Sequence, residues 1–472
     1  MSNQLIKTFP FKPTSGQESA IRELNEFIQY QGINSVFILK GYAGTGKTTL
    51  ISSVINWLPN VGLNSVLVAP TGRAAKVLSS YSKKPASTIH KQIYYQGNKD
   101  GRINFTLQKN KQANTIFVVD EASMIGDSGG LGGSFAARDK TLLDDLFDYV
   151  FSGVNCKIIL LGDVAQLPPV GGTDSPALQQ DYLSSRYPVR VWARELTEVT
   201  RQSEDSGILF NATLLREILL QNESFTPHFI LDDFVDIKRL VGYEIEEHLS
   251  SSYSNVGIEN TVVICRSNKQ ANNFNKYIKF NVLWQEEELN AGDLLMVVRN
   301  NYYWVDDEKI GFIANGDMVE IMRVVNYEEK FGFRFANVSL KLSDYKEGIE
   351  FEVKILLDTL TAETPALSRE EGNRLYEEVQ NSYIEIRDKR KRQKAIKENP
   401  YFNALQVKFG YAITCHKSQG GQWDNVFVDQ GYLTEEMIDR EYIRWLYTAI
   451  TRAKSNLYLT NFHPRFFGEE SF

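Results

Sequence analysis

The sequence predicts an α/β fold with two parallel-sheet cores and a small insert in each. Short apolar runs rich in Val, Ile and Leu alternate with helical patterns through the first half of the chain, which is typical of buried parallel strands joined by helices. A second α/β series begins near residue 261, and short alternating strands interrupt it between residues 292 and 358. At roughly 150 residues per domain, the 472 residues correspond to about three structural units.

The first core is predicted to contain strands at residues 35–40, 64–69, 115–119 and 156–161. Each is a nearly continuous apolar run bounded by turn or capping residues. We expect helices to begin near Lys47, Thr71 and Lys140. The strands and helices therefore alternate, as in a parallel sheet covered by helices.

The second half of the chain contains three kinds of sequence pattern. Residues 195–254 are mostly helical in pattern, and strand character returns at residues 261–265, 411–414, 425–429 and 456–460, with a helical stretch at 268–283. Residues 292–358 predict a small antiparallel barrel, and residues 368–398 predict a highly charged helix. The barrel and the charged helix are therefore expected to be inserted into the second core.

Composition excludes several classes of protein. A hydrophobic fraction of 42% and a net charge of −7 describe a globular chain, and they exclude a disordered chain and a histone-like DNA-coating protein. Any nucleic-acid contact must then come from a local basic surface. Three widely spaced cysteines and five scattered histidines predict neither a disulfide framework nor a metal cluster. Because no apolar leader or run of about 18 apolar residues occurs, we expect a cytoplasmic protein.

Residues 41–48, GYAGTGKT, match the phosphate-binding pattern G-x-x-x-x-G-K-T between a predicted strand and a predicted helix. Glycines let the backbone approach an anion and point its N–H groups at the charge. We expect Lys47 to neutralise the β and γ phosphates of a nucleotide and Thr48 to bind Mg²⁺. The residues expected to bind the nucleotide here are Gly41, Ala43, Gly44, Thr45, Gly46, Lys47, Thr48 and Thr49.

Two further strand ends supply acid and amide groups. In VVDEASM, Asp120 and Glu121 follow a buried strand, where two carboxylates need compensation. We expect Asp120 to hold Mg²⁺ and Glu121 to polarise the attacking water as general base. Gln166, in LGDVAQLPPV, is placed to sense the γ-phosphate or that water.

Three other residues are candidates for the nucleotide site, and a structural interpretation stands beside the functional one for Gln17 and Arg452. Gln17 is a candidate reader of adenine, but Thr14 or Ser15 in the same TSGQ segment is also a candidate helix cap. Arg201 and Arg452 are candidate arginine fingers, because a guanidinium stabilises the charge on a phosphoryl group during transfer. For Arg452, a structural cation at the end of a helix is the alternative.

Eight segments occur in the order of the superfamily 1 helicase motifs: GYAGTGKTT, APTGRAAKVL, ASTIHK, VVDEASM, LGDVAQLPPV, LTEVTRQ, YAITCHKSQGGQWDNVFV and YTAITRAKSNLYL. The chain resembles the RecD-like superfamily 1B DNA helicases over nearly its whole length. The resemblance implies two RecA-like P-loop NTPase cores with ATP between them, a small insert in the first core, and an SH3-like β-barrel insert in the second. It also implies 5′-to-3′ movement on single-stranded DNA.

The resemblance also implies domain boundaries and further site residues. It assigns residues 1–90 and 115–195 to the first core, 91–114 to a strand-separating pin, 196–291 and 400–472 to the second core, and 292–399 to the barrel and charged helix. Gln419 and Gly420 are expected at the nucleotide. The residues expected to contact nucleic acid are Thr71, Arg73, His90, Phe105 of the pin, Thr414, His416, Lys417 and Ser418, since hydroxyls and cations contact phosphates without reading bases.

The sequence therefore predicts an ATP- and Mg²⁺-dependent helicase that unwinds duplex DNA. An RNA-directed helicase and an ATP-gated nucleic-acid clamp or translocase without unwinding are the alternatives. Because one chain supplies both halves of the ATP site, we expect a monomer, with protein partners from replication, recombination or repair left open. The basic segment near Arg387 is either a solvated face or a strand-side contact, and the Gly-rich segment after Met124 is expected to be a surface loop.

Overall fold

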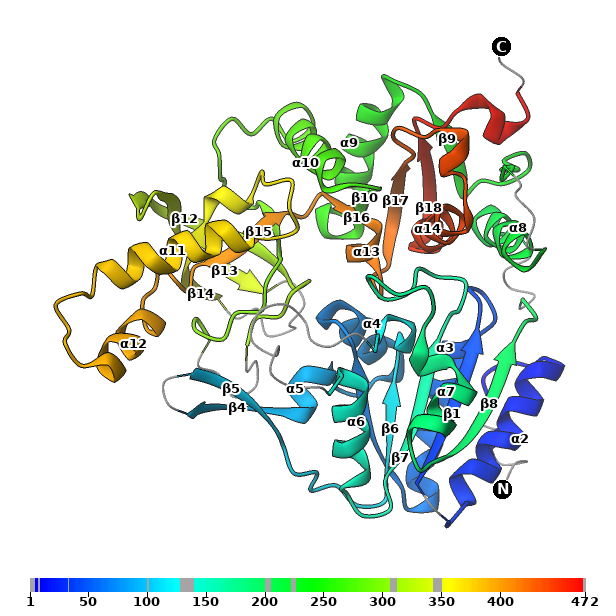
Figure 1. Ribbon diagram of the computed structural model, residues 1–472. Helices are drawn as coiled ribbons and strands as arrows, with labels where there is room; N and C mark the ends of the chain where they lie inside the picture. The colour runs from blue at the N-terminus through cyan, green and yellow to red at the C-terminus, as the bar shows by residue number, and fades with distance from the viewer. Residues whose placement is uncertain are drawn as a thin grey trace.

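The computed structural model describes residues 5–6, 9–32, 34–99, 102–127, 140–199, 205–221, 226–305, 312–342 and 350–469, without the side chains of 96–99 and 102–105. Its elements form two stacked α/β layers with a β-barrel at one side (Figure 1). The predicted α/β class with two cores and a barrel is confirmed. The domain boundaries stay a prediction.

The first core is built on a parallel six-stranded sheet in the order β3-β2-β6-β7-β1-β8. The four predicted strands are its centre: β1 (Ser35–Gly41), β2 (Asn64–Ala69), β6 (Thr115–Val119) and β7 (Lys157–Gly162). The edge strands β3 (Ala86–Thr88) and β8 (Arg190–Leu196) were not predicted. Edge strands are short or charged and therefore lack the continuous apolar run of a buried strand.

Helices cover both faces of this sheet. They are α2 (Ser15–Gln29), α3 (Lys47–Trp57), α4 (Gly72–Ser82), α5 (Ile89–Ile93), α6 (Leu142–Phe151) and α7 (Gln180–Arg186). The predicted starts agree to within two residues, because Thr71 and Thr141 are N-caps whose hydroxyls accept a bond from the third residue of the helix. Two apolar clusters, one on each face of the sheet, make the core.

The second core is a parallel five-stranded sheet in the order β16-β10-β17-β18-β9. Its strands are β9 (Ile237–Leu240), β10 (Thr261–Cys265), β16 (Ala412–Thr414), β17 (Trp423–Asp429) and β18 (Ala453–Thr460). Its helices are α8 (Gly207–Gln221), α9 (Glu244–Val256), α10 (Asn268–Tyr277), α13 (Cys415–Ser418) and α14 (Arg440–Ile450). Residues 195–254 were expected to be mostly helical, and α8 and α9 agree; the sequence pattern did not reveal β9, an edge strand with two cations between its apolar ends.

The barrel closes with five strands: β11 (Leu294–Val297), β12 (Met318–Lys330), β13 (Phe333–Leu342), β14 (Glu350–Leu356) and β15 (Leu405–Phe409). All its strand pairs are antiparallel except β14–β15, which is parallel. The chain passes through two helices, α11 (Arg369–Asn381) and α12 (Lys389–Lys397), before it returns as β15. The single charged helix of the prediction is therefore two helices.

A two-stranded hairpin occupies the predicted pin insert. β4 (Tyr94–Lys99) pairs antiparallel with β5 (Arg102–Leu107). The register places Phe105 opposite Gln96, three pairs back from the closing pair of Lys99 and Arg102. The side chain of Phe105 and most of the Gly-rich segment after Met124 lie outside the described residues. In the part of the chain that is described, no helix combines the length and the apolarity needed to span a bilayer.

Candidate functional site

The phosphate loop connects β1 to α3 at the edge of the first sheet where the carboxyl end of β1 lies. Gly44 and Gly46 have φ of 75° and 78°, a left-handed conformation that favours glycine. A Cβ on Gly41 would lie 2.8 Å from the Thr45 hydroxyl, so a side chain is excluded there. No side chain caps α3, which leaves the N–H groups of its first turn and the positive end of its dipole facing the loop. The loop therefore fits a polyphosphate.

Lys47 lies against the same loop. Its Nζ donates to the carbonyl oxygens of Gly41 and, at 2.8 Å, of Tyr42. The Thr45 hydroxyl donates to the Tyr42 carbonyl at 2.8 Å. The ammonium is thus held at the mouth of the loop, where a phosphate oxygen would take the place of the carbonyls.

Gln17 takes part in the cap of α2 and also contacts the phosphate loop. Thr14 is the N-cap of α2, and Gln17 completes a capping box by accepting from the Thr14 N–H at 3.0 Å. The Gln17 amide also donates to the Thr45 carbonyl of the phosphate loop at 3.0 Å. The cap interpretation is confirmed for Thr14, and Gln17 lies beside the nucleotide loop; its contact with adenine stays a prediction.

The two acids follow β6 and face the phosphate loop. The Glu121 N–H donates to Asp120 Oδ1 at 2.9 Å, and Glu121 adopts a left-handed φ of 51°. Burial, together with the Glu121 charge, raises the pKa of Asp120 to about 7, while the Lys47 and Arg452 cations oppose that rise. The hydroxyl of Tyr81 from α4 lies next to Thr48 and Asp120, and burial raises its pKa. Thr48 and Asp120 offer a hydroxyl and a carboxylate oxygen, which are ligands that suit Mg²⁺.

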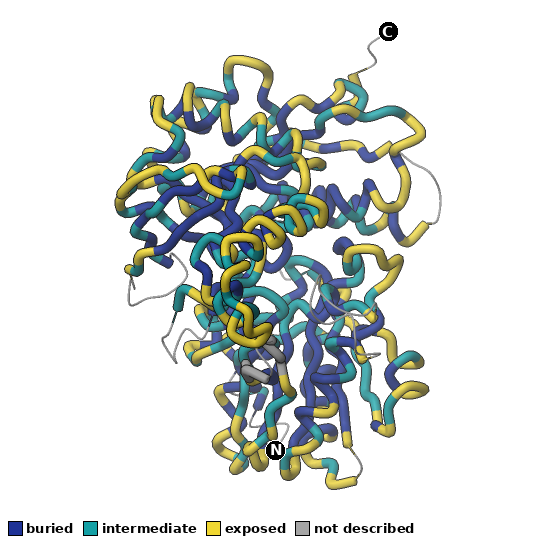
Figure 2. Tube along the Cα trace, turned by 60° about the vertical axis from the view of Figure 1, so that its left-hand side comes forward, coloured by how far each residue is buried: buried dark blue, intermediate teal, exposed yellow. Residues whose placement is uncertain are grey.

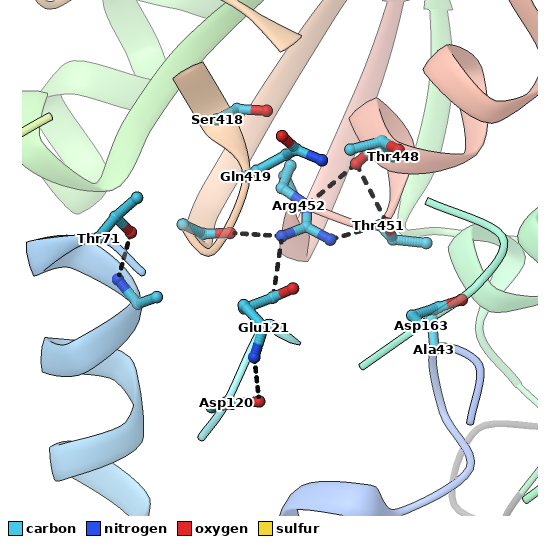
Figure 3. Close-up of polar contacts among 12 residues, drawn as sticks. Ala43, Thr71, Asp120, Glu121, Asp163, Ser418, Gln419, Thr448, Thr451 and Arg452 are labelled. Carbon is cyan, nitrogen blue, oxygen red and sulfur yellow. Dashed lines mark hydrogen bonds and ion pairs between the residues drawn. The ribbon is translucent and has the colours of Figure 1, made fainter. Parts of the chain in front are cut away.

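Arg452 reaches from the second core to the acids of the first. Its Nη1 lies 3.7 Å from Glu121 Oε1, and its side chain is almost fully buried (Figure 3). Its Nε donates to the Thr448 carbonyl at 3.0 Å, and its Nη2 donates to the Thr451 hydroxyl at 3.3 Å. The bond to Thr448 at the end of α14 agrees with the structural alternative for this residue, and the ion pair with Glu121 places the same guanidinium in the cleft between the cores.

A chain of hydrogen bonds crosses between the cores beside Arg452. The Ala43 N–H of the phosphate loop donates to the Tyr447 hydroxyl at 2.9 Å, and that hydroxyl donates to Asp163 Oδ2 at 2.7 Å. Sequence reasoning missed Tyr447 and Asp163. The available signals were a tyrosine on the apolar face of an amphipathic helix and an acid directly after the buried strand β7.

Two more bonds join the cores at the loop after β7. The Leu167 N–H donates to the Thr448 hydroxyl, and the Gln419 amide donates to the Leu167 carbonyl, each at 2.8 Å. Gln166 lies between these contacts, is 8% exposed, and its Oε1 has no hydrogen-bond partner among the described residues. Burying an amide oxygen without a hydrogen-bond partner costs free energy. The Oε1 of Gln166 is therefore available to accept a hydrogen bond from a bound molecule. The other candidate finger, Arg201, lies outside the described residues.

Thr71 and Arg73, two of the predicted strand-contacting residues, lie at the seam between the cores. Thr71 caps α4 by accepting from the Ala74 N–H at 3.2 Å. The Arg73 guanidinium stacks on the Trp423 ring at 3.8 Å. Gly420 packs so closely that a Cβ would lie 2.6 Å from the Cβ of Ala74. These contacts hold α4 against the second core, and the roles of the three residues toward DNA or nucleotide stay predictions.

The remaining predicted contacts are more enclosed than expected. Burial lowers the pKa of His90 to about 4 and also lowers that of His416, so both rings are neutral at pH 7. Burial lowers the pKa of Lys417 to about 8, and its Nζ donates to Asn315 of the barrel at 2.6 Å. The Ser418 hydroxyl is fully buried and donates to the Cys415 carbonyl at 2.8 Å. Thr414, which precedes α13, is half-buried and makes no capping bond.

Comparisons with known proteins agree with this arrangement. Residues 25–172 match the AAA domain, and residues 409–460 match the UvrD-like helicase C-terminal domain. The chain is 24% identical to an uncharacterized protein of Methanocaldococcus jannaschii over 90% of its length, but it spans only 36% of that relative. It is also 24% identical to an uncharacterized mimivirus protein, covering 93% of this chain and 98% of the relative.

Two relatives have an assigned activity. The ATP-dependent DNA helicase dda of Enterobacteria phage T4 is 26% identical, with 66% of this chain and 67% of the relative covered. The ATP-dependent RecD2 DNA helicase of Deinococcus radiodurans is 31% identical over 36% of this chain and 20% of its own length. Among solved structures, Pif1 helicase from Bacteroides with ADP-AlF3 and ssDNA is 16% identical, covering 97% of this chain and 94% of that chain, at a TM-score of 0.46. Where the two cores meet, Lys47, Asp120, Glu121 and Arg452 lie together, and in sequence the chain is similar to helicases of the RecD and dda kind.

Proposed function

We propose that this protein is an ATP-dependent DNA helicase that moves 5′-to-3′ on single-stranded DNA and unwinds duplex DNA. The observation that supports this most is the position of Arg452, whose guanidinium lies 3.7 Å from Glu121 although the two residues belong to different cores. Groups from both cores therefore meet at one phosphate site. Binding and loss of a γ-phosphate there would change how tightly the cores close on each other.

The side chains in the cleft have complementary tasks in this proposal. Lys47 leaves the loop carbonyls to neutralise the β and γ phosphates, and Glu121 accepts the proton of the attacking water. Gln166 directs its unpaired Oε1 to that water or to the γ-phosphate region. Arg452, with Arg201, stabilises the charge that spreads over the oxygens of the transferred phosphoryl group.

The residues present fit a magnesium ion. Thr48 and Asp120 would hold it, and the raised pKa of Asp120 is what a carboxylate shows when it is buried with a like charge beside it. When bound, Mg²⁺ supplies positive charge that neutralises the phosphate oxygens.

The strand would run over the loops that begin α4 and α13, with hydroxyls and cations on its phosphates. The β4–β5 hairpin is proposed to be the pin that splits the duplex as the strand is pulled past it. The 5′-to-3′ polarity is proposed from the resemblance of the motifs to those of the RecD-like helicases. One chain contains both halves of the ATP site, so we propose a monomer, acting with proteins of replication, recombination or repair.

ATP hydrolysis by the purified protein tests this proposal. We expect hydrolysis to be stimulated by single-stranded DNA oligomers and to be lost in Lys47→Ala. Stimulation by a matched RNA oligomer alone would favour the RNA-directed alternative. Hydrolysis that no nucleic acid stimulates would contradict the proposed coupling, and stimulated hydrolysis without strand separation would leave a clamp or translocase.

A further inference from the structure

Helix α12 and the residues before it form a concentrated positive surface on an acidic protein. Residues 387–397, RDKRKRQKAIK, contain seven basic residues and one acid, while the whole chain has a net charge of −7. The ATP site and the cleft between the cores use none of these residues. We call this segment the basic helix.

The order of charges in the basic helix opposes its own folding. Lys389, Arg390 and Lys391 form its first turn, which contains no acid. The N-terminus of a helix is the positive end of its dipole and favours anions. Arg390 and Lys394 are also like charges four residues apart, which destabilises a helix. The N-cap Asp388 offsets part of this cost, but it is one acid beside three cations, so helix stability does not account for all three.

The three cations of the first turn exceed the counter-charge beside them, which is the N-cap Asp388, whose pKa is lowered by the backbone N–H groups and the charges of Lys391 and Arg390. Farther along the helix, Lys394 pairs with Glu398 at 3.7 Å, and both side chains are largely exposed. Lys389, Arg390 and Lys391 are exposed and make no ion pair with any described residue. Clustered, exposed cations in excess of their counter-charges are typical of a surface that binds a polyanion.

The basic helix is nevertheless held firmly in place. Asp388 accepts from the backbone N–H groups of Arg390 and Lys391 at 2.8 and 3.1 Å. Arg392 turns back and donates to the Ile386 carbonyl at 2.9 Å. Ile396 is buried in an apolar cluster with residues of α11 and of the barrel strands β13 and β14. The cations of the first turn are therefore presented on a fixed surface and not on a loose tail, which lowers the entropy lost when they bind.

The basic helix lies on the same side of the molecule as the β4–β5 hairpin, opposite α2 (Figure 1). When this side is turned forward, an exposed helical surface occupies the front of the molecule (Figure 2). The predicted single-strand contacts, in contrast, begin α4 and α13 on the two cores. A polyanion that meets α12 is therefore on the hairpin side of the protein, where strands would not yet be separated.

We propose that Lys389, Arg390 and Lys391 bind the phosphate backbone of the unseparated DNA duplex as it approaches the hairpin. This inference rests on the proposed helicase function. It identifies a duplex-binding surface on the barrel insert, separate from the single-strand path across the cores. The contacts are to phosphates, so they hold the duplex without selecting its sequence.

The test compares duplex and single-strand binding in a variant that removes the three charges. Lys389→Gln, Arg390→Gln and Lys391→Gln are combined, and binding of a blunt duplex and of a single-stranded oligomer is measured by fluorescence anisotropy without ATP over a range of salt concentrations. We expect duplex affinity at about 50 mM salt to fall by roughly tenfold or more and the slope of log K against log salt to decrease by about 2 to 3, since each phosphate contact contributes about 0.9. Single-strand affinity and DNA-stimulated hydrolysis should change less than twofold.

A second triple variant controls for charge. Lys12→Gln, Arg22→Gln and Lys238→Gln remove the same three charges from exposed positions on α2, its preceding loop and β9, and should retain most of the duplex affinity. Unchanged duplex binding in the α12 variant, or an equal loss in both triple variants, overturns the proposal. An equal loss for duplex and single strand also overturns it, in favour of a strand-side contact. If the wild-type protein shows no DNA-stimulated hydrolysis, the helicase function itself has failed, and the duplex measurement still reports on α12.

Discussion

Replacing Tyr447 with Phe tests whether the hydrogen bonds between the cores are needed for hydrolysis. The hydroxyl accepts from the phosphate-loop Ala43 N–H at 2.9 Å and donates to Asp163 at 2.7 Å. Removal of this oxygen keeps the shape of the buried ring but breaks the link from α14 to the phosphate loop and to Asp163, one of several direct links between α14 and the first core. We therefore expect Tyr447→Phe to weaken the closed arrangement in which Arg452 meets Glu121.

The size of the effect follows from the burial of Asp163. This residue is 2% exposed, and among the described residues it keeps the bond from the Ala165 N–H after the substitution. A hydrogen bond to a charged group contributes about 1.5–3 kcal/mol. Ala43 is half-buried, and water can replace the lost partner of its N–H. The loss of that bond therefore adds little to the free-energy cost of the substitution. Since about 1.4 kcal/mol corresponds to a factor of ten in an equilibrium, closure should become roughly 10- to 100-fold less favourable.

The assay is steady-state ATP hydrolysis at saturating single-stranded DNA. We expect kcat to fall by about 10- to 100-fold, with a much smaller change in the KM for ATP because the phosphate loop keeps its conformation. Tyr442→Phe is the matched control, since Tyr442 lies in the same helix, is equally buried, and its hydroxyl accepts from Gln430 of the second core. The same kcat in Tyr447→Phe and the wild type, or an equal loss in both variants, would refute the reasoning.

Three other predictions concern the same cleft. Glu121→Gln should lower the hydrolysis rate by at least about 100-fold while nucleotide binding persists, as measured by turnover and by calorimetry with ADP; substantial residual turnover would exclude Glu121 as the base. Because burial raises the pKa of Asp120 to about 7, protons should compete with Mg²⁺, so the Mg²⁺ concentration for half-maximal rate should rise as pH falls from 8 to 6; a constant value would contradict this role. Gly420→Ala should slow DNA-stimulated hydrolysis about tenfold or more, because its Cβ would lie 2.6 Å from the Cβ of Ala74 and Gly420 has a φ of 72°. A normal kcat would show that hydrolysis does not need the close contact between Gly420 and α4.

The parts of the fold that could be predicted are those whose signal is local. Central strands such as β1 and β6 are buried on both faces and therefore read as continuous apolar runs. The edge strands β3, β8 and β9 have one unpaired side and tolerate charge, so their pattern resembles loop or helix. The parallel closure of the barrel by β15 depends on pairing across two intervening helices, which no local pattern reports.

The same distinction holds for the candidate site. Lys47, Asp120 and Glu121 follow strand ends within short motifs, and the structure brings them together. The link from Ala43 through Tyr447 to Asp163 joins residues hundreds of positions apart, and it depends on how the two cores pack. Burial also could not be predicted from the motifs. Arg73 has the residue type of a phosphate contact, yet its guanidinium stacks on Trp423.

The most direct test of the central claim is strand separation on two partial duplexes, one with a 5′ single-stranded tail and one with a 3′ tail. With ATP and Mg²⁺, the wild-type protein should separate only the 5′-tailed duplex, and Lys47→Ala should separate neither. Separation of only the 3′-tailed duplex would contradict the proposed polarity. Failure to separate either duplex, while single-stranded DNA still stimulates hydrolysis, would contradict the claim that this protein is a helicase.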